Sequence, residues 1–269
     1  MKVAMQECPQ HKIAIIDLDH SSEAADLLTG LCGVEGGARF VMVRDGTARR
    51  QGIVPLSANA QPLPPSAFDI PGWHVVTGGF GGLGRLTIAW LAAHHAAQIA
   101  ILAPRAPADW RDFAERTRIS YGATLRWLPC DVADHHQLTG ALEELAAEGG
   151  VAGVIHAAGL IEDSLIPEED EAAFKRVWAV KAEASDALQS WLAAHGSRYL
   201  LLYSSAAAMM GTAGQTAHAS ACGYLDGFAE AQRSDTALKV ISIAWVPGAD
   251  SAGPMMTGFR AASPRRVWG

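Results

Sequence analysis

Cysteine is scarce in this sequence, and the few cysteines lie far apart. The chain has 269 residues and 4 cysteines, and none of them stands in a Cys-x-x-Cys pair. They are Cys8, Cys32, Cys130 and Cys222. This spacing excludes a disulfide framework and a zinc site of the usual ligand spacing. We therefore predict reduced thiols, no metal site and a cytoplasmic protein.

Runs of basic charge and long apolar stretches are also missing. The 21 basic and 28 acidic residues give a net charge of −7, and without a run of lysine and arginine a nucleic-acid partner is not expected. The N-terminus has no apolar core of signal-peptide length. The longest apolar stretch, 88–102, is interrupted by His94, His95 and Gln98 and is too short to cross a bilayer. We predict no membrane association.

The chain does contain enough apolar residues to bury a large core. Hydrophobic residues make up 49% of it, and its length suits one large domain with a small appendage. Residues 1–56 are predicted to be a strand-rich appendage with a hairpin around Asp45-Gly46. Its predicted strands are 12–17, 39–43 and 52–54. Residues 57–71 are rich in proline and are predicted to be a linker.

From residue 72 to residue 269, strand-length apolar runs alternate with helix-length segments. The predicted strands are 74–77, 98–103, 124–128, 151–156, 199–204 and 239–245. Continuous apolar strands that alternate with helices are typical of a parallel sheet covered on both faces. We therefore predict a doubly wound, Rossmann-like α/β fold for this region.

A glycine-rich turn follows the first strand of this region and precedes a predicted helix at 85–95. Its residues are Thr77, Gly78, Gly79, Phe80, Gly81, Gly82, Leu83 and Gly84. Such a turn lets backbone N–H groups approach a pyrophosphate at the start of the helix. Glycines also serve ordinary tight turns, but the strand–turn–helix context favours a nucleotide site.

The ends of the next strands refine this prediction. An NAD site usually has an acidic residue about 20 positions after the glycines. Here Pro104 and Arg105 follow the second strand, and Arg105 suits a 2′-phosphate, which favours NADPH; the alternative is a solvated surface arginine. Further candidate cofactor contacts are Asp131, Val132, His156, Ala157, Ala158 and Gly159. Alone, Asp131 would be a strand-end cap and His156 a packed strand-end histidine.

Taken in order, these motifs and the segment 204–226 resemble the ketoreductase (KR) domains of modular polyketide synthases, members of the short-chain dehydrogenase/reductase superfamily. The resemblance extends over about residues 12–260. It implies that residues 1–56 are part of a truncated structural subdomain and that residues 72–269 form the NADPH-binding domain. It also implies reduction of a β-ketoacyl thioester on an acyl carrier protein, with other polyketide synthase domains as partners.

The resemblance assigns four catalytic positions. Lys181 matches the family's lysine and Ser205 its serine. His218 stands where the family has its tyrosine, and Cys222 where it has an asparagine. The family's Trp-Gly-x-Trp segment is replaced at 245–248, and the resemblance implies that the chain ends short of the family's last strand and helix. We therefore expect marginal stability or self-association.

The replacement at His218 bears on activity. In the family, a tyrosine hydroxyl near a lysine donates a proton to the new alkoxide. An imidazole has a suitable ordinary pKa, but Lys181 disfavours its charged form, and the ring is shorter than a phenol. We expect weak or lost reduction, with a non-catalytic scaffold or a stand-alone short-chain reductase as alternatives. Cys222 and His218 could also form a nucleophile pair or bind a metal. The competing interpretation is that they are two packed residues at a site that has lost its function.

Two positions resemble those that mark stereochemistry in the family. Asp163 occupies the last position of the family's Leu-Asp-Asp triplet, which here reads Ile161-Glu162-Asp163. Met210 stands where the opposite class has a tryptophan. If the domain reduces a substrate, the resemblance implies a B-type, 3R product; alternatively, Asp163 is only a loop acid.

Overall fold

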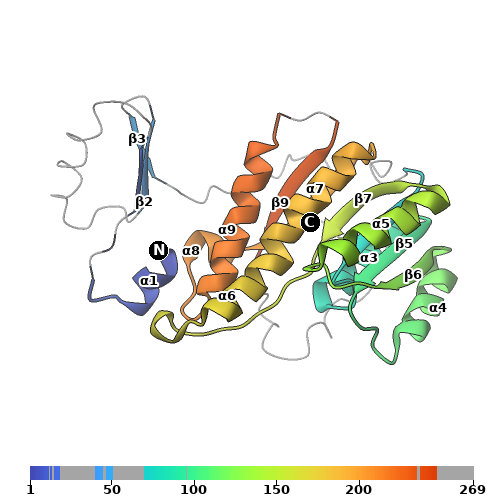
Figure 1. Ribbon diagram of the computed structural model, residues 1–269, viewed down its shortest axis with the longest axis horizontal. Helices are drawn as coiled ribbons and strands as arrows, with labels where there is room; N and C mark the ends of the chain where they lie inside the picture. Colours follow the sequence, from blue (N-terminus) through green and yellow to red (C-terminus); the bar gives the residue numbers. More distant parts are fainter. Residues whose placement is uncertain are drawn as a thin grey trace.

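The computed structural model contains two β-sheets in the part of the chain that it describes (Figure 1). The described residues are 1–11, 13, 15–18, 40–44, 47–50, 70–94, 96–234 and 237–246. The predicted strand at 52–54, residues 57–69 of the predicted linker, Cys32 and the chain end at 247–269 lie outside these residues.

The larger sheet has six parallel strands in the order β6-β5-β4-β7-β8-β9. Its strands are β4 (Trp73–Thr77), β5 (Gln98–Ala103), β6 (Thr124–Pro129), β7 (Val151–His156), β8 (Tyr199–Ser205) and β9 (Lys239–Trp245). Every strand predicted for this region is present. The apolar runs form strands because both faces of the sheet are covered, so that side chains pointing either way are buried.

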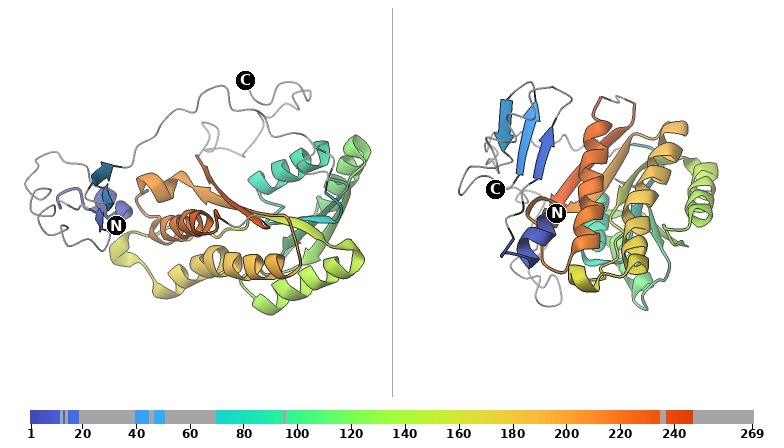
Figure 2. Two further views of the ribbon diagram at one scale, coloured as in Figure 1. Left: turned by 90° about the horizontal axis from the view of Figure 1, so that it is seen from above. Right: turned by 60° about the vertical axis from the view of Figure 1, so that its left-hand side comes forward.

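Helices cover the two faces of this sheet, as the doubly wound prediction requires (Figure 2, left). On one face, α3 (Gly82–Ala93) and α4 (Trp110–Tyr121) pack through side chains such as Ile88 and Phe113. On the other, α5 (His135–Gly149), α7 (Ala184–Ala194) and α9 (Thr216–Ala231) bury leucines against the sheet. Each face therefore has its own apolar core.

The strand order reverses between β4 and β7, which are neighbours in the sheet but not in the sequence. Their last residues, Thr77 and His156, are partners in the register. In open parallel sheets, ligands bind beyond the carboxyl ends of the strands at such a reversal. The fold thus brings the glycine-rich turn and the 156–159 segment to one place.

A long helical segment connects β7 to β8 and changes its winding in the middle. It runs from α6 (Glu171–Trp178) through the π-helical turn η3 (Ala179–Glu183) into α7. π-Helical turns are rare and are frequent at functional sites. Here the turn carries Lys181, and no sequence pattern predicted it.

The smaller sheet has the order β1-β2-β3 and lies beside α1 (Lys2–Glu7) (Figure 1). Its strands are β1 (Ile15–Leu18), β2 (Phe40–Arg44) and β3 (Thr47–Arg50). The predicted hairpin is confirmed, because β2 and β3 pair antiparallel. Arg44 pairs with Thr47, so the strand that returns after Asp45-Gly46 is β3, whereas the strand predicted at 52–54 lies outside the described residues.

Two composition-based predictions can be compared with the described residues. Among the described cysteines, Cys8, Cys130 and Cys222 form no disulfide. Among the described helices, none is both long and apolar enough to traverse a lipid bilayer. Helix α1 was not predicted at all.

Candidate active site

The glycine-rich turn is built by contacts of backbone against backbone. Gly78 has a φ of 64°, and a Cβ there would lie 2.7 Å from the Cα of Ala158. A Cβ on Gly84 would lie 2.5 Å from the carbonyl oxygen of Gly78. Only glycine fits at these two positions, so the turn brings α3 directly against β4 and β7.

The same turn leaves the start of α3 open to an anion. The residue before the helix, Gly81, has no side chain to cap it, and the first turn of α3 carries no acidic residue. Uncapped N–H groups and the positive end of the helix dipole together favour a phosphate. The residues at the turn therefore fit the pyrophosphate of a dinucleotide.

Thr77 and His156 support the turn from inside. Both are fully buried, and Thr77 Oγ1 lies 2.7 Å from His156 Nδ1 while it accepts a hydrogen bond from the N–H of Ala158 at 3.1 Å. Burial, with a smaller effect of the Lys181 charge, lowers the pKa of His156 to about 3. The side chains of Thr77 and His156 thus join β4 to β7, and we interpret their role as stabilising this part of the sheet.

The buried His156 makes the stability of the fold depend on pH. The unfolded chain binds a proton below pH 6.5, whereas the folded chain does not until about pH 3, so stability falls as pH drops from 6.5 towards 3. Between pH 6.5 and 5, the natural protein should lose about 1–2 kcal/mol more than His156→Asn, which keeps an acceptor for Thr77. Urea unfolding at both pH values measures this, and equal losses would contradict it.

The residues expected to face the adenosine lie on exposed loops. Arg105 is exposed, and the loop that carries it is held at its far end by Asp109, which accepts hydrogen bonds of 2.9 and 2.8 Å from Arg85 of α3. Asp131 is also exposed and accepts a hydrogen bond from the N–H of Ala133 at 3.0 Å. The sequence did not predict the Arg85–Asp109 pair, because its partners belong to different elements.

Other residues of the predicted cofactor segment have packing roles. Val132 and Ala158 are buried, and the ring of Phe80 contacts those of Trp110 and Trp127 at centroid distances of 6.4 and 6.5 Å. This aromatic cluster lies on the α4 side of the glycine turn. The side chain of Phe80 therefore points away from the turn's backbone amides, into the α3–α4 core.

Lys181 is a buried cation beside the glycine turn. Its side chain is only 4% exposed, and Nζ donates to the carbonyl oxygens of Tyr203 at 2.9 Å and Ala158 at 3.4 Å. Its Cε lies 3.1 Å from where a Cβ on Gly159 would be. Burial lowers the pKa of this lysine. Because Ala158 also contacts Gly78, Lys181 and the glycine turn share one region of the fold.

Ser205 and Cys222 lie where β8 meets α9. Ser205 begins the short helix α8 (Ala206–Met210), and its Oγ accepts a hydrogen bond from the N–H of Ala207 at 3.2 Å. Its neighbour Ser204 donates to the carbonyl oxygen of Cys222 at 3.1 Å. The end of β8 is thereby fixed against α9, which carries both Cys222 and His218.

His218 and Cys222 contact each other one helical turn apart. His218 Nε2 lies 3.6 Å from Cys222 Sγ, and His218 Nδ1 is buried with no hydrogen-bond partner among the described residues. Burial and then the charge of Lys181 lower the pKa of His218, although Asp163 acts in the opposite direction. Burial also raises the pKa of Cys222. At neutral pH the pair is a neutral imidazole and a thiol, which is not an activated nucleophile.

The two positions that the sequence predicts to bear on stereochemistry, Asp163 and Met210, flank this cluster. Asp163 accepts hydrogen bonds from Gln215 Nε2 at 3.2 and 3.4 Å, and it is near enough for its charge to act on His218. Met210 ends α8 and is 53% exposed. The structure thus brings Lys181, Ser205, His218, Cys222 and Asp163 into one neighbourhood.

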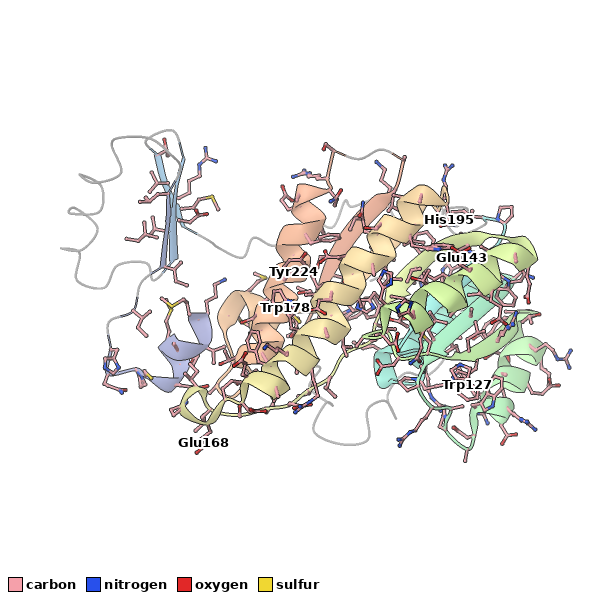
Figure 3. All side chains as sticks on the ribbon, in the orientation of Figure 1. Trp127, Glu143, Glu168, Trp178, His195 and Tyr224 are labelled. Carbon is pink, nitrogen blue, oxygen red and sulfur yellow. The ribbon has the colours of Figure 1, made fainter. Side chains whose placement is uncertain are left out.

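The two nearby tyrosines are engaged elsewhere. Tyr203 is buried, and its hydroxyl lies 2.6 Å from Thr87 Oγ1. The ring of Tyr224 contacts that of Trp178 in a tilted arrangement with a centroid distance of 5.1 Å (Figure 3), and its hydroxyl donates to Asp186 at 2.6 Å. Neither is placed to act in the cluster. In the described part of the chain, no group of three or more His, Cys, Asp or Glu residues could hold a metal ion.

Comparison with known proteins identifies the family. Residues 72–250 match the KR domain family, and this span contains the whole cluster and the glycine turn. The chain belongs to the KR domain family. The resemblance carried by the sequence motifs is therefore confirmed at the level of the family.

This KR domain is similar to segments of much longer polyketide synthases. It is 32% identical over 252 residues to the spectinabilin polyketide synthase system protein NorA' of Streptomyces orinoci, with 91% of this chain and 7% of that protein covered. It is 30% identical over 281 residues to the pikromycin polyketide synthase component PikAIII of Streptomyces venezuelae, with 99% and 18% covered. The chain thus spans less than a fifth of the length of either relative.

Solved ketoreductases have the same fold. The ketoreductase PlmKR1 from the first module of phoslactomycin biosynthesis in Streptomyces sp. HK803 superposes with a TM-score of 0.81 at 29% identity, over 96% of this chain and 59% of that one. An A-type ketoreductase from a modular polyketide synthase gives a TM-score of 0.78 at 28% identity, over 91% and 52%. The Rossmann-like architecture is thereby confirmed.

Proposed function

We propose that this KR domain binds NADPH and has the architecture for reducing a β-ketoacyl thioester, but reduces it weakly or not at all. The observation that carries the proposal is the cluster of Lys181, Ser205, His218 and Cys222 beside an intact glycine turn. Lysine, serine and turn fit the family's chemistry, whereas His218 and Cys222 do not. We infer that His218 stands at the position of the family's tyrosine.

The glycine turn and its neighbours would hold the cofactor. The first N–H groups of α3 would bind the pyrophosphate, and Arg105 would bind the 2′-phosphate. Bound NADPH supplies a hydride. Lys181 lies close to the turn through Ala158 and Gly159, so its charge would act on a nucleotide held at the turn.

Proton donation is the step for which this cluster lacks a suitable acid. Reduction of a ketone needs a group that gives up a proton to the forming alkoxide. His218 is neutral at neutral pH, because burial and Lys181 lower its pKa, and a neutral imidazole is a much weaker acid than an imidazolium. The Cys222 thiol does not replace the missing acid, because burial raises its pKa and its sulfur contacts His218.

Ser205 and Asp163 define what a substrate would meet. Ser205 Oγ, which already accepts from Ala207, keeps its own hydrogen to donate to a substrate carbonyl. Asp163, fixed by Gln215, stands at the family's stereochemical position, so a reduced product would have the 3R configuration. The substrate would be carried by an acyl carrier protein, with other synthase domains as partners.

A non-catalytic scaffold within a synthase is the second candidate. The neutral His218–Cys222 pair favours it, because no described group in the cluster replaces the missing acid. The two candidates differ in one measurement, the rate of NADPH oxidation with a β-ketoacyl N-acetylcysteamine thioester. A rate that depends on thioester supports the reductase, whereas NADPH binding without such a rate supports the scaffold.

The cofactor assignment can be tested by binding alone. In Arg105→Ala, NADPH should bind about tenfold more weakly while NADH affinity stays the same, because only NADPH carries the phosphate that Arg105 would contact. Isothermal titration calorimetry measures both affinities. Arg111→Ala, another exposed arginine nearby on α4, is the matched control and should leave both unchanged. If the natural protein bound neither nucleotide, the assignment would be wrong.

A further inference from the structure

Helix α1 packs against the segments that surround the cluster, although it lies some two hundred residues away in sequence. Val3 and Met5 are buried, and Lys2 Nζ donates to the carbonyl oxygen of Ala208 in α8 at 3.2 Å. Gly211, with a φ of 74°, lets α1 come close, since a Cβ there would lie 2.6 Å from the carbonyl carbon of Lys2. Figure 2 (right) shows α1 beside the first turns of α9.

Glu7, the last residue of α1, joins two of these segments. Its Oε2 accepts a hydrogen bond from the N–H of Ile166 at 2.7 Å, and its Oε1 accepts one from the N–H of Gly214 at 2.8 Å. One carboxylate thus bridges the loop after β7 and the turn before α9. Hydrogen bonds to an ionised acceptor are stronger than those between neutral groups.

Both bridged segments lead directly to the cluster. The N–H of Ser164 donates to the carbonyl oxygen of Gly214 at 2.9 Å, and Gln215 donates to Asp163. Helix α9 begins at Thr216, so His218 lies in its first turn, immediately after the residues that Glu7 holds. The position of Asp163 relative to His218 therefore depends on the contact between these two segments.

We propose that Glu7 is a positioning residue for the candidate active site: by bridging the Ile166 and Gly214 amides, it holds the Asp163 loop closed against the start of α9. It acts through these backbone groups and contacts neither substrate nor cofactor. The inference rests on the proposed function, because that function makes the cluster an active site. Its test nevertheless requires neither turnover nor a bound nucleotide.

The buried thiol of Cys222 reports whether the bridge closes the site. In Glu7→Gln, the amide side chain has only one oxygen to accept with, so one of the two N–H groups loses its partner and the loop opens more often. Alkylation of Cys222 by iodoacetamide should then be about tenfold faster than in the natural protein. Peptide mass spectrometry after timed labelling measures each cysteine separately. Glu7→Asp, which keeps the charge on a shorter side chain, should give an intermediate rate.

Two controls separate positioning from general loss of stability. Cys130 is buried directly after β6, which lies at the other end of the molecule from α1 (Figure 1). Its labelling should stay unchanged in Glu7→Gln. Glu168→Gln makes the same substitution at an exposed position of the same loop (Figure 3) and should leave Cys222 unchanged. In Glu7→Gln, but not in Glu168→Gln, the His218 imidazole resonance should also shift.

The outcomes are distinct from those that decide the proposed function. Equal acceleration at Cys222 and Cys130 would show that Glu7 only stabilises the fold. An unchanged Cys222 rate, or faster labelling with an unshifted His218 resonance, would also overturn the proposal. A protein that never reduces a thioester can still show the selective effect, and an active reductase can fail to show it.

Discussion

The double variant His218→Tyr/Cys222→Asn should reduce a β-ketoacyl N-acetylcysteamine thioester about 10²–10⁴-fold faster than the natural protein. The physical reason is that a phenol stays protonated at neutral pH, and the nearby Lys181 would favour the phenolate that forms when it gives up its proton. Spectrophotometry of NADPH consumption measures both rates. The natural protein should turn over at less than about 1 s⁻¹, which is the lower end of ordinary enzyme rates.

Each single substitution should recover much less than the pair. Groups that act as a unit are strongly non-additive, so a tyrosine beside Cys222, or an asparagine beside His218, leaves the site incomplete. In the structure the two side chains touch, with 3.6 Å between Nε2 and Sγ, so changing one alters the surroundings of the other. The single variants are therefore the internal control for the double one.

The pH dependence gives an independent check on the same residues. If His218 itself donates the proton in the natural protein, activity must fall as pH rises through its pKa, which burial and Lys181 place below the ordinary value. The double variant should not follow this profile, because its donor is a phenol. Natural protein that turns over at an ordinary rate at pH 8 would contradict the proposed weak activity.

The sequence predicted the features of this fold that depend on local pattern. The six parallel strands and the strand–turn–helix around Gly78 follow from continuous apolar runs and glycine spacing, which act over a few residues. The family resemblance placed Lys181, Ser205, His218 and Cys222 at positions that the fold does bring together. The strands of the larger sheet begin and end within one residue of their predicted bounds.

Features that depend on contacts between distant residues could not be predicted. Glu7 reaches partners at Ile166 and Gly214, and neither its type nor its neighbours in sequence signal this. Likewise, the Thr77–His156 contact requires β4 and β7 to be adjacent, which only the assembled sheet establishes. The π-helical turn at Lys181 has no known sequence signature in an otherwise helical pattern.

Gly84→Ala should abolish measurable nucleotide binding, with at least a 100-fold loss of NADPH affinity, or about 2.7 kcal/mol. The added Cβ would lie 2.5 Å from the Gly78 carbonyl oxygen and 2.6 Å from the Gly79 Cα, and both are backbone atoms that no change of side-chain rotamer can move. The start of α3 must therefore shift away from the turn, which misplaces the N–H groups that would bind the pyrophosphate. Calorimetry with NADPH measures the loss.

The same substitution at Gly140 separates this effect from a general effect of alanine. Gly140 lies inside α5, and a Cβ there would meet nothing within 4 Å. Because alanine favours a helix interior by about 1 kcal/mol over glycine, Gly140→Ala should raise the free energy of unfolding slightly and leave NADPH affinity unchanged. Gly84→Ala should instead lower the free energy of unfolding by about 1–3 kcal/mol, the usual cost of overpacking. If Gly84→Ala bound NADPH as tightly as Gly140→Ala does, the close contact between α3 and the turn would not be what forms the phosphate site.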